Sequence, residues 1–407
     1  MLLFFLPLAA GCTSSNPPPP PPAAATVSPS RSAAAQAALD RLVGATRSHD
    51  RAAFDLTVSG RDPSFRDRAR LLYANLSSLP LEQLELRLQP GEQDLPAARR
   101  ELLGRDAWRQ PATVTWRLVG EGAAAEHTVW LTFTLREGIP LLAGTSDTPS
   151  GRAAPEPIWW TGPVTAVRSG PASVLVGAGQ PAAAWSSRVR AAVTQVQRRL
   201  TAGPAAGWSG SVVVEVPASR ARFEAVLGSA DGGYANIAAV TLPEGPAARA
   251  AVRVVVNPDV TRTLSGTGVA IVLLHEMVHV ASRSAQSPAP TWLVEGLADY
   301  VALQAHRSAA AGAAEPLLQR VRARGAPQQL PADDRFRAAA DDLAVSYAEA
   351  WLACRYIAER YSPAALQRLY TAVDSGVALD EAVQDELGVS TQELTTGWRR
   401  YLVRLAS

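Results

Sequence analysis

The 407-residue sequence contains no lysine, so all 39 of its basic residues are arginines, set against 37 acidic residues. The basic residues are not clustered and the formal net charge is only +2, so nothing indicates binding to nucleic acid or to an anionic membrane surface. No apolar run is long enough for a membrane-spanning helix, which excludes a polytopic membrane protein. A hydrophobic fraction of 47% excludes an intrinsically disordered chain. The missing lysine indicates a compositional bias, not a function.

Cysteine is also scarce, with only Cys12 and Cys354 in the chain. Cys354 lies in an apolar helical pattern with Trp351, Leu352 and Ile357, which predicts a buried small hydrophobic side chain. Cys12 has a different explanation at the amino terminus, so we predict no disulfide.

The amino terminus has an apolar stretch, Met1 to Ala10, that ends in Ala9-Ala10-Gly11-Cys12. This pattern resembles the lipobox of bacterial lipoproteins, in which the cysteine is lipidated and becomes the first mature residue. The resemblance implies a signal over residues 1–12, lipidation of Cys12, and a protein anchored to the cell membrane on its extracytoplasmic face. Residues 13–35 include six consecutive prolines and predict a stiff tether. One departure is that no basic residue precedes the apolar stretch.

Residues 36–150 are predicted to form a small α+β accessory domain. A helical stripe over residues 39–46 is followed by Asp62-Pro63, a start signal for a second helix. Alternating apolar residues then predict strands at 84–88, 114–118 and 129–135. Helices followed by antiparallel strands favour a sheet curled around a helix. This layout resembles the cone-shaped nuclear-transport-factor-2-like fold.

His127 shares a strand face with Val129 and Leu131. It either points into a cone-shaped pocket or is a strand-end histidine that neighbours satisfy, and we assign the domain no chemistry. We expect the domain to space, dock or bind. Residues 151–162 are rich in proline and glycine and predict a linker to a second domain over 163–407.

The second domain alternates predicted strands with helices. A hairpin is predicted over 164–176, strands over 211–216, 234–242 and 251–257, and helices over 182–202, 218–228 and 264–282. The last of these helices contains His275-Glu276-Met277-Val278-His279.

The two histidines lie four residues apart, so a helix places both imidazoles on one face, where they can bind one metal ion. Glu276 lies about 100° round the helix from His275, where it can take a proton from a metal-activated water without becoming a ligand. The alternative is a buried helix whose histidines only form hydrogen bonds. Because the helix is otherwise apolar, unpaired ionisable groups there would be costly, which favours the metal.

A catalytic zinc takes three protein ligands and keeps a fourth position for water. After a turn, Thr291 is a plausible N-cap for a returning helix, and Glu295 lies one turn into that helix. Asp299 follows on the same face and is placed to accept the second N–H of a ligating imidazole. Asp299 is also the alternative third ligand.

His-Glu-x-x-His followed by Trp-Leu-x-Glu-Gly-x-Ala-x-Tyr resembles the gluzincin metallopeptidases, in particular the peptidase-MA-like bacterial families. The resemblance implies a zincin-like catalytic domain, in which a mixed sheet and an active-site helix precede a helical subdomain. It implies one Zn²⁺ per chain, held by His275, His279 and Glu295, with Glu276 as catalytic base and Asp299 as the carboxylate behind a ligand. It also implies peptide or protein substrates.

Other parts of such a site are less sharply defined by the sequence. An edge strand that pairs with substrate is expected near 232–240, although an ordinary sheet strand fits equally well. Tyr347 is the candidate donor to the oxyanion, with Tyr300 and Tyr356 as competitors and core packing as the alternative. Residues 307–340 read as a surface insertion near the cleft.

Two functions therefore remain open. The first is hydrolysis of peptide bonds by a membrane-tethered zinc peptidase. The second is a non-catalytic surface lipoprotein that binds a ligand, with a vestigial or structural metal site.

Overall fold

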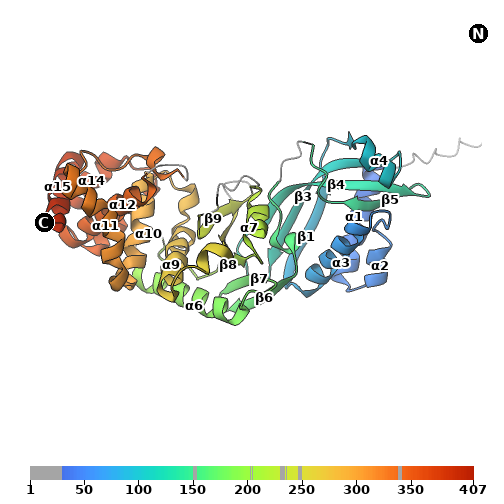
Figure 1. Cartoon of the computed structure of the whole chain (residues 1–407), viewed down its shortest axis with the longest axis horizontal. Coiled ribbons are helices and arrows are strands. Elements are labelled where there is room, and N and C mark those ends of the chain that lie inside the picture. The colour runs from blue at the N-terminus through green and yellow to red at the C-terminus, as the bar shows by residue number, and fades with distance from the viewer. Residues whose placement is uncertain are drawn as a thin grey trace, which may run out of the picture.

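A computed structural model of the chain describes residues 30–149, 154–201, 203, 205–229, 234, 236–245, 250–337 and 342–407. The molecule is elongated, with an N-terminal α+β module at one end, a second sheet in the middle and a helical region at the other end (Figure 1). Cys12 and most of the predicted tether lie outside the described residues. Among the helices in the described part of the chain, none combines the length and apolarity needed to cross a bilayer.

The N-terminal module is a curled antiparallel sheet with helices against it, which confirms the predicted α+β layout. Its strands run in the order β1-β3-β4-β5, with the short β2 paired to β3. The chain enters its first helix earlier than predicted, because Ser30 caps that helix and Ala35 is already buried. The helices are α1 (Arg31–Arg47), α2 (Arg51–Asp55), α3 (Pro63–Ser78) and α4 (Ala97–Leu103), and the strands are β1 (Leu81–Leu88), β2 (Gln93–Asp94), β3 (Trp108–Leu118), β4 (Ala125–Arg136) and β5 (Ile139–Gly144).

The second sheet is mixed and has the order β6-β7-β8-β10-β9. Strands β7, β8 and β10 are parallel, whereas β6 and β9 pair antiparallel at the two edges. The predicted hairpin is therefore confirmed as β6 and β7. The strands are β6 (Val164–Ser169), β7 (Ala172–Gly177), β8 (Val213–Val216), β9 (Ala239–Glu244) and β10 (Ala251–Val256).

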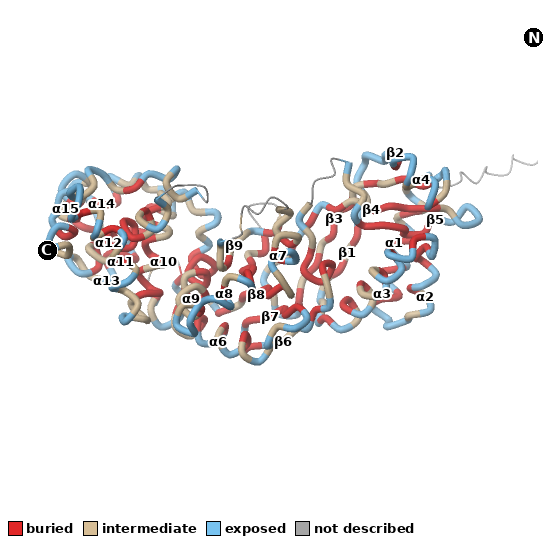
Figure 2. The backbone as a smooth tube through the Cα atoms, in the orientation of Figure 1, coloured by how far each residue is buried: buried red, intermediate tan, exposed pale blue. Residues whose placement is uncertain are grey.

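Each face of this second sheet packs against a different part of the chain. Val174, Val214 and Val254 face a core that they share with the helices. Their strand neighbours Leu175 and Val255 face a core that they share with the N-terminal module. The sheet is thus covered on both sides, as the continuous burial along these strands shows (Figure 2). Burial on both faces explains why the strands are runs of valine without polar alternation.

The predicted linker over 151–162 includes a core element. Ile158–Thr161 form the short helix α5, and all four residues are buried. Trp159 stacks on Trp160 and meets Trp116 of β3 edge to face. The buried Asn75 of α3 donates to the carbonyls of Trp159 (2.6 Å) and Gly162 (2.8 Å). The linker was predicted from the prolines and glycines of this segment. The two tryptophans between them pack in the core that joins the N-terminal module to the second sheet.

The elements that follow β10 are helices and turns, and two further helices, α6 and α7, come before β10 in the chain. Residues 307–340 are not mainly a surface insertion, because most of them form α11, which packs on α12 and α15. The helices and turns are α6 (Ala182–Arg199), α7 (Arg220–Leu227), α8 (Pro258–Thr261), α9 (Gly266–Ser282), η1 (Ser284–Gln286), α10 (Thr291–Ala305), α11 (Arg307–Arg324), η2 (Asp333–Phe336), α12 (Leu343–Arg360), α13 (Pro363–Asp374), α14 (Leu379–Leu387) and α15 (Thr391–Ala406).

Helices α10 and α12 pack closely because α10 carries Gly296. A Cβ atom at this position would lie 2.4 Å from the carbonyl oxygen of Ala350 and 2.6 Å from Sγ of Cys354. Cys354 is fully buried and free, as its helical pattern predicts. The close approach fixes the helix that carries Glu295 against the helix that carries Tyr347.

We expect Gly296→Ala to lower the free energy of unfolding by about 1–3 kcal/mol, because the two helices must move apart to admit the methyl group. Gly312→Ala in α11 is the matched control, since a Cβ there meets nothing within 4 Å. That control should be neutral or stabilise by up to about 1 kcal/mol through helix propensity. Thermal or urea denaturation measures both, and equal stability of the two variants would contradict the packing argument.

Candidate metal centre

Two antiparallel-packed helices, α9 and α10, deliver the predicted site residues. Helix α9 begins at Gly266, where the Ser265 side chain accepts from the amide of Gly268. It ends at Arg283, whose left-handed backbone (φ 54°) turns the chain into η1. The chain then reverses, and α10 starts at Thr291. Thr291 is therefore the first helical residue and Pro290 takes the N-cap position that was predicted for Thr291.

The turn brings three ligand atoms of the predicted metal site together. Nε2 of His275 lies 3.0 Å from Nε2 of His279 and 3.1 Å from Oε2 of Glu295. Nε2 of His279 lies 3.4 Å from the same Glu295 oxygen. Tetrahedral zinc with bonds of about 2.0–2.1 Å separates its ligand atoms by about 3.3 Å. The triangle thus has the size of one face of a zinc coordination tetrahedron.

The hydrogen bonds behind the imidazoles set which nitrogen carries the proton. Nδ1 of His275 lies 2.8 Å from Oδ1 of Asp299, and Nδ1 of His279 lies 2.8 Å from the hydroxyl of Ser284. A carboxylate only accepts, so Nδ1 of His275 donates, and in the neutral imidazole its Nε2 keeps a lone pair. When the Ser284 hydroxyl accepts from Nδ1 of His279 in the same way, both Nε2 atoms have a free lone pair and face the Glu295 oxygen. Oε2 of Glu295 is buried without a hydrogen-bond partner.

With the neutral imidazoles in this tautomer, the three lone pairs converge, and a cation placed among them would pair with the ionised Glu295 carboxylate. Among the described residues, this is the one group of three or more His, Cys, Asp or Glu side chains with metal-binding spacing. Asp299 contacts the far nitrogen of His275, so the geometry gives it the supporting position and Glu295 the ligand position. The donor set of two imidazoles and one carboxylate suits zinc.

The electrostatics of the site also favour positive charge. Burial opposes ionisation of His275, but the carboxylates of Asp299 and Glu295 outweigh it and raise the pKa of His275 well above its usual value. Burial likewise opposes ionisation of Glu295, but the two imidazoles outweigh it and hold the pKa of Glu295 far below its usual value. The pocket thus keeps an ionised carboxylate facing the imidazoles.

Glu276 lies next to the triangle and is 8% exposed. Its Oε2 accepts a hydrogen bond of 2.5 Å from Oγ1 of Thr241, on the edge strand β9. The edge strand expected at 232–240 therefore runs at 239–244 instead, and of the expected range the structure describes only residue 234 and residues 236–240. Thr241 was not anticipated, because the sequence does not fix the register of an edge strand against a helix.

Of the three tyrosines considered as oxyanion donors, Tyr347 on α12 is the one whose ring lies beside a predicted metal ligand. Its ring centroid is 6.3 Å from that of His275 and 5.5 Å from that of Phe336 in η2. Burial and the carboxylates of Glu295, Asp299 and Glu276 raise the pKa of Tyr347, so its hydroxyl remains a donor.

The two competing tyrosines lie elsewhere. The hydroxyl of Tyr300 accepts from Gln304, one turn further along α10, and Tyr356 packs on Tyr361 and Tyr401. Neither ring contacts His275 or His279 among the ring contacts of the described residues.

A cavity of 260 Å³ opens beside the triangle. Glu295 is the one acidic residue in its lining, and the other side chains are small or uncharged apart from His279. They are Thr241, His279, Ser284, Ala285, Ser287, Ala289, Thr291, Val294 and Glu295.

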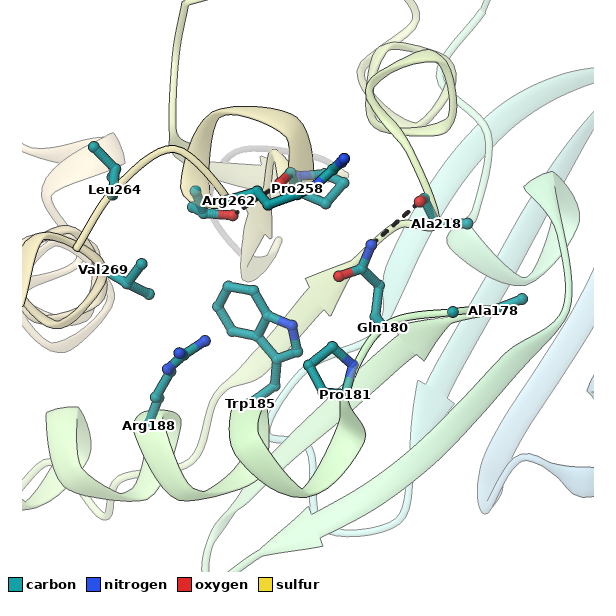
Figure 3. A pocket seen from close by; sticks show the side chains of 12 residues that line it. Ala178, Gln180, Pro181, Trp185, Arg188, Ala218, Pro258, Arg262, Leu264 and Val269 are labelled. Atoms are coloured by element: carbon teal, nitrogen blue, oxygen red, sulfur yellow. Dashed lines mark hydrogen bonds between the residues drawn. The ribbon is translucent and has the colours of Figure 1, made fainter. Parts of the chain in front are cut away.

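A larger cavity, of 580 Å³, lies at the carboxyl ends of β7, β8 and β10 (Figure 3). Trp185, Arg188 and Arg262 face into it, and Gln180 donates to the carbonyl of Ala218 across one side. None of its lining residues belongs to the metal triangle or contacts it. This cavity is therefore separate from the predicted site.

Comparison with known families gives one match, and it covers the part of the chain that carries the site. Residues 250–404 match the Peptidase MA superfamily, a range that starts just before β10 and includes α9, α10 and Tyr347. No curated protein and no solved structure shows significant similarity to the chain. The chain contains a Peptidase MA superfamily domain, and this domain together with the triangle indicates a metallopeptidase, a hydrolase.

Proposed function

We propose that the protein is a zinc-dependent peptidase that hydrolyses peptide bonds with a metal-activated water. The observation that carries the proposal is the triangle of three possible ligand atoms, 3.0–3.4 Å apart, which is the one such group among the described residues. Two of these atoms come from the His-Glu-x-x-His segment of a Peptidase MA superfamily domain.

His275, His279 and Glu295 would hold the zinc, and among the described residues no fourth His, Cys, Asp or Glu joins them. Structural zinc sites take four protein ligands, so three ligands favour a catalytic site over a structural one. When bound, the zinc ion would act as a Lewis acid that lowers the pKa of a water molecule and polarises the scissile carbonyl.

The protein side chains around the triangle each have one task in this reaction. Glu276 accepts the proton of the attacking water and passes it to the leaving amine. Asp299 and Ser284 hold the two imidazoles in the tautomer that leaves Nε2 free. Tyr347 donates its hydroxyl proton as a hydrogen bond to the oxyanion that develops on the substrate.

The edge strand β9 and the small cavity favour an extended peptide as substrate. Among the described residues, strand β9 pairs with β10 alone, so its other edge can add a substrate strand by main-chain hydrogen bonds. The cavity beside Glu295 has hydroxyl and small apolar walls. A substrate residue with a small, uncharged side chain fits these walls best.

Glu276→Gln should keep one zinc per chain and lower kcat at least about 100-fold, because the amide holds the same shape but cannot take a proton. Zinc content by atomic spectroscopy and cleavage of a broad peptide library measure the two effects. A chelator should abolish cleavage by the wild type, and added zinc should restore it.

The same library separates the peptidase from the second candidate, a binding module with a vestigial metal site. Cleavage that persists both in the presence of the chelator and in Glu276→Gln would contradict the zinc-peptidase proposal. So would a zinc-loaded wild type that cleaves no peptide of the library.

Tyr347→Phe should lower kcat about 10²- to 10³-fold with little change in zinc content, since it removes one donor to the oxyanion. Tyr300→Phe and Tyr356→Phe are matched controls, because these tyrosines lie on α10 and α12, the helices that carry Glu295 and Tyr347, but contact other residues. Steady-state kinetics on one cleaved peptide compares the three. An equal loss in all three variants would point to helix packing and not to an oxyanion contact.

We also propose that Cys12 is lipidated and tethers the peptidase to the extracytoplasmic face of the cell membrane. The support is the sequence pattern Ala-Ala-Gly-Cys after an apolar stretch, followed by a proline-rich spacer. The resemblance of the accessory module to the nuclear-transport-factor-2-like fold likewise stays a prediction.

Cys12→Ser should move the full-length protein from the membrane fraction to the soluble fraction and abolish labelling by a fatty-acid analogue. Cys354→Ser is the control, because that thiol is buried and should leave both readouts unchanged. Membrane association that persists in Cys12→Ser would refute the lipid anchor.

A further inference from the structure

The edge strand β9 contacts the catalytic helix with one face and the N-terminal module with the other. Thr241 reaches Glu276 on the α9 side, where Ala239 also joins the core of the helical region. Val240 and Leu242 pack on the opposite side, in the core of the N-terminal module. The alternation of a strand thus separates two contacts that are only one residue apart in sequence.

Thr241 fixes one oxygen of the Glu276 carboxylate. Its Oγ1 lies 2.5 Å from Oε2 and 3.3 Å from the backbone carbonyl oxygen of Glu276. Among the described residues, Oε1 of Glu276 has no hydrogen-bond donor, so that oxygen is left to accept a proton. A carboxylate held by one oxygen has fewer orientations than a free one, and proton transfer depends on that orientation.

Glu244, at the end of β9, binds a buried group of charges that includes side chains of the N-terminal module. Its Oε2 lies 3.1 Å from Nη1 of Arg253 and 3.4 Å from Nε2 of His127 on β4. Arg253, fully buried in β10, also binds Glu121 of the module at 2.8 Å and stacks over Trp116 at 3.7 Å. His127 therefore lies beside a carboxylate of the second sheet.

The charges of this group favour an ionised Glu244. Burial would raise the pKa of Glu244, but Arg253 and His127 outweigh burial and lower it. Glu215 shares Arg253 at 3.3 Å, and burial together with the Glu244 charge raises the pKa of Glu215 well above its usual value. Breaking one partner of a buried charged group is costly, so the contact resists separation of β9 from β4.

The backbone next to Glu244 also lies close to the N-terminal module. Gly245 has a positive φ of 135°, and a Cβ there would lie 3.3 Å from Cβ of Glu126 on β4. At the adjoining end of β10, the amide of Ala251 donates to the carbonyl of Ala124 at 3.3 Å. The module thus contacts this end of β9 and β10 through side chains and through backbone.

We infer that Thr241 is a positioning residue for Glu276, and that the N-terminal module holds in place the strand that carries Thr241. Residues of the accessory module thereby affect catalysis indirectly, because they contact the strand that positions Glu276. The inference rests on the proposed peptidase function, in which Glu276 accepts the proton.

Thr241→Val and Thr241→Ser test the first half. Valine keeps the shape but removes the donor, so kcat should fall about 10- to 100-fold while KM and zinc content stay within about twofold. Serine keeps the donor and should restore kcat to within about threefold of the wild type. An unchanged kcat in Thr241→Val, or an equal loss in both variants, would overturn the inference.

A second readout does not need an active enzyme. Crystal structures of the metal-free wild type, Thr241→Val and Thr241→Ser should show the Glu276 side chain in one conformation in the wild type and in Thr241→Ser, and displaced or in several conformations in Thr241→Val. If the wild type neither binds zinc nor cleaves peptides, the proposed function fails, and these structures still decide the positioning role. An unmoved Glu276 in Thr241→Val would refute that role.

Glu244→Gln tests the second half, with Glu359→Gln in the exposed Arg355–Glu359 pair as matched control. In the metal-free protein, amide hydrogen exchange over residues 239–244 should rise at least about 10-fold in Glu244→Gln and stay unchanged in the control. If Glu244→Gln does not fold, His127→Leu serves, because it removes the module's contact to Glu244 and leaves Arg253 paired. Unchanged exchange in β9 would show that the module does not hold the strand.

Discussion

The structure depends on the convergence of three electron-pair acceptors at one point between two helices. Nε2 of His275, Nε2 of His279 and Oε2 of Glu295 lie 3.0–3.4 Å apart, and Nδ1 of each imidazole contacts a polar group on the far side, Asp299 for His275 and Ser284 for His279. Such an arrangement is costly in a buried site unless a cation occupies it. The polar groups that contact the two imidazoles, and Glu276 beside His275, are arranged around this point.

The rest of the fold can be understood as support for that point from three sides. The close approach of α10 and α12 at Gly296 fixes the distance between the helix that carries Glu295 and the helix that carries Tyr347. Strand β9 supports Glu276 from the sheet side through Thr241. The N-terminal module covers the far face of the sheet with an apolar core and the charges around Arg253. The accessory module is thus continuous with the catalytic domain through packing, although the sequence suggested a separate unit.

Sequence alone predicted the parts of the site that follow from helical periodicity. The four-residue spacing of His275 and His279 and the returning helix with Glu295 and Asp299 depend only on local geometry. Thr241 could not be predicted, because its contact depends on the register of β9 against α9, which tertiary packing sets. The fold shows the same division. The periodic strands β6 and β7 and the helix α9 were found within a few residues, whereas β5 was not predicted, α5 lies among prolines that indicated a linker, and α11 has an alanine-rich sequence without a clear apolar face.

Anomalous diffraction at the zinc edge, on crystals of the zinc-loaded protein, tests the central claim most directly. The account predicts one zinc per chain, bound at about 2.0–2.2 Å by Nε2 of His275, Nε2 of His279 and a carboxylate oxygen of Glu295, with an open position toward the cavity beside Thr241. A zinc bound elsewhere, or an anomalous map without a peak among these three side chains, would contradict it.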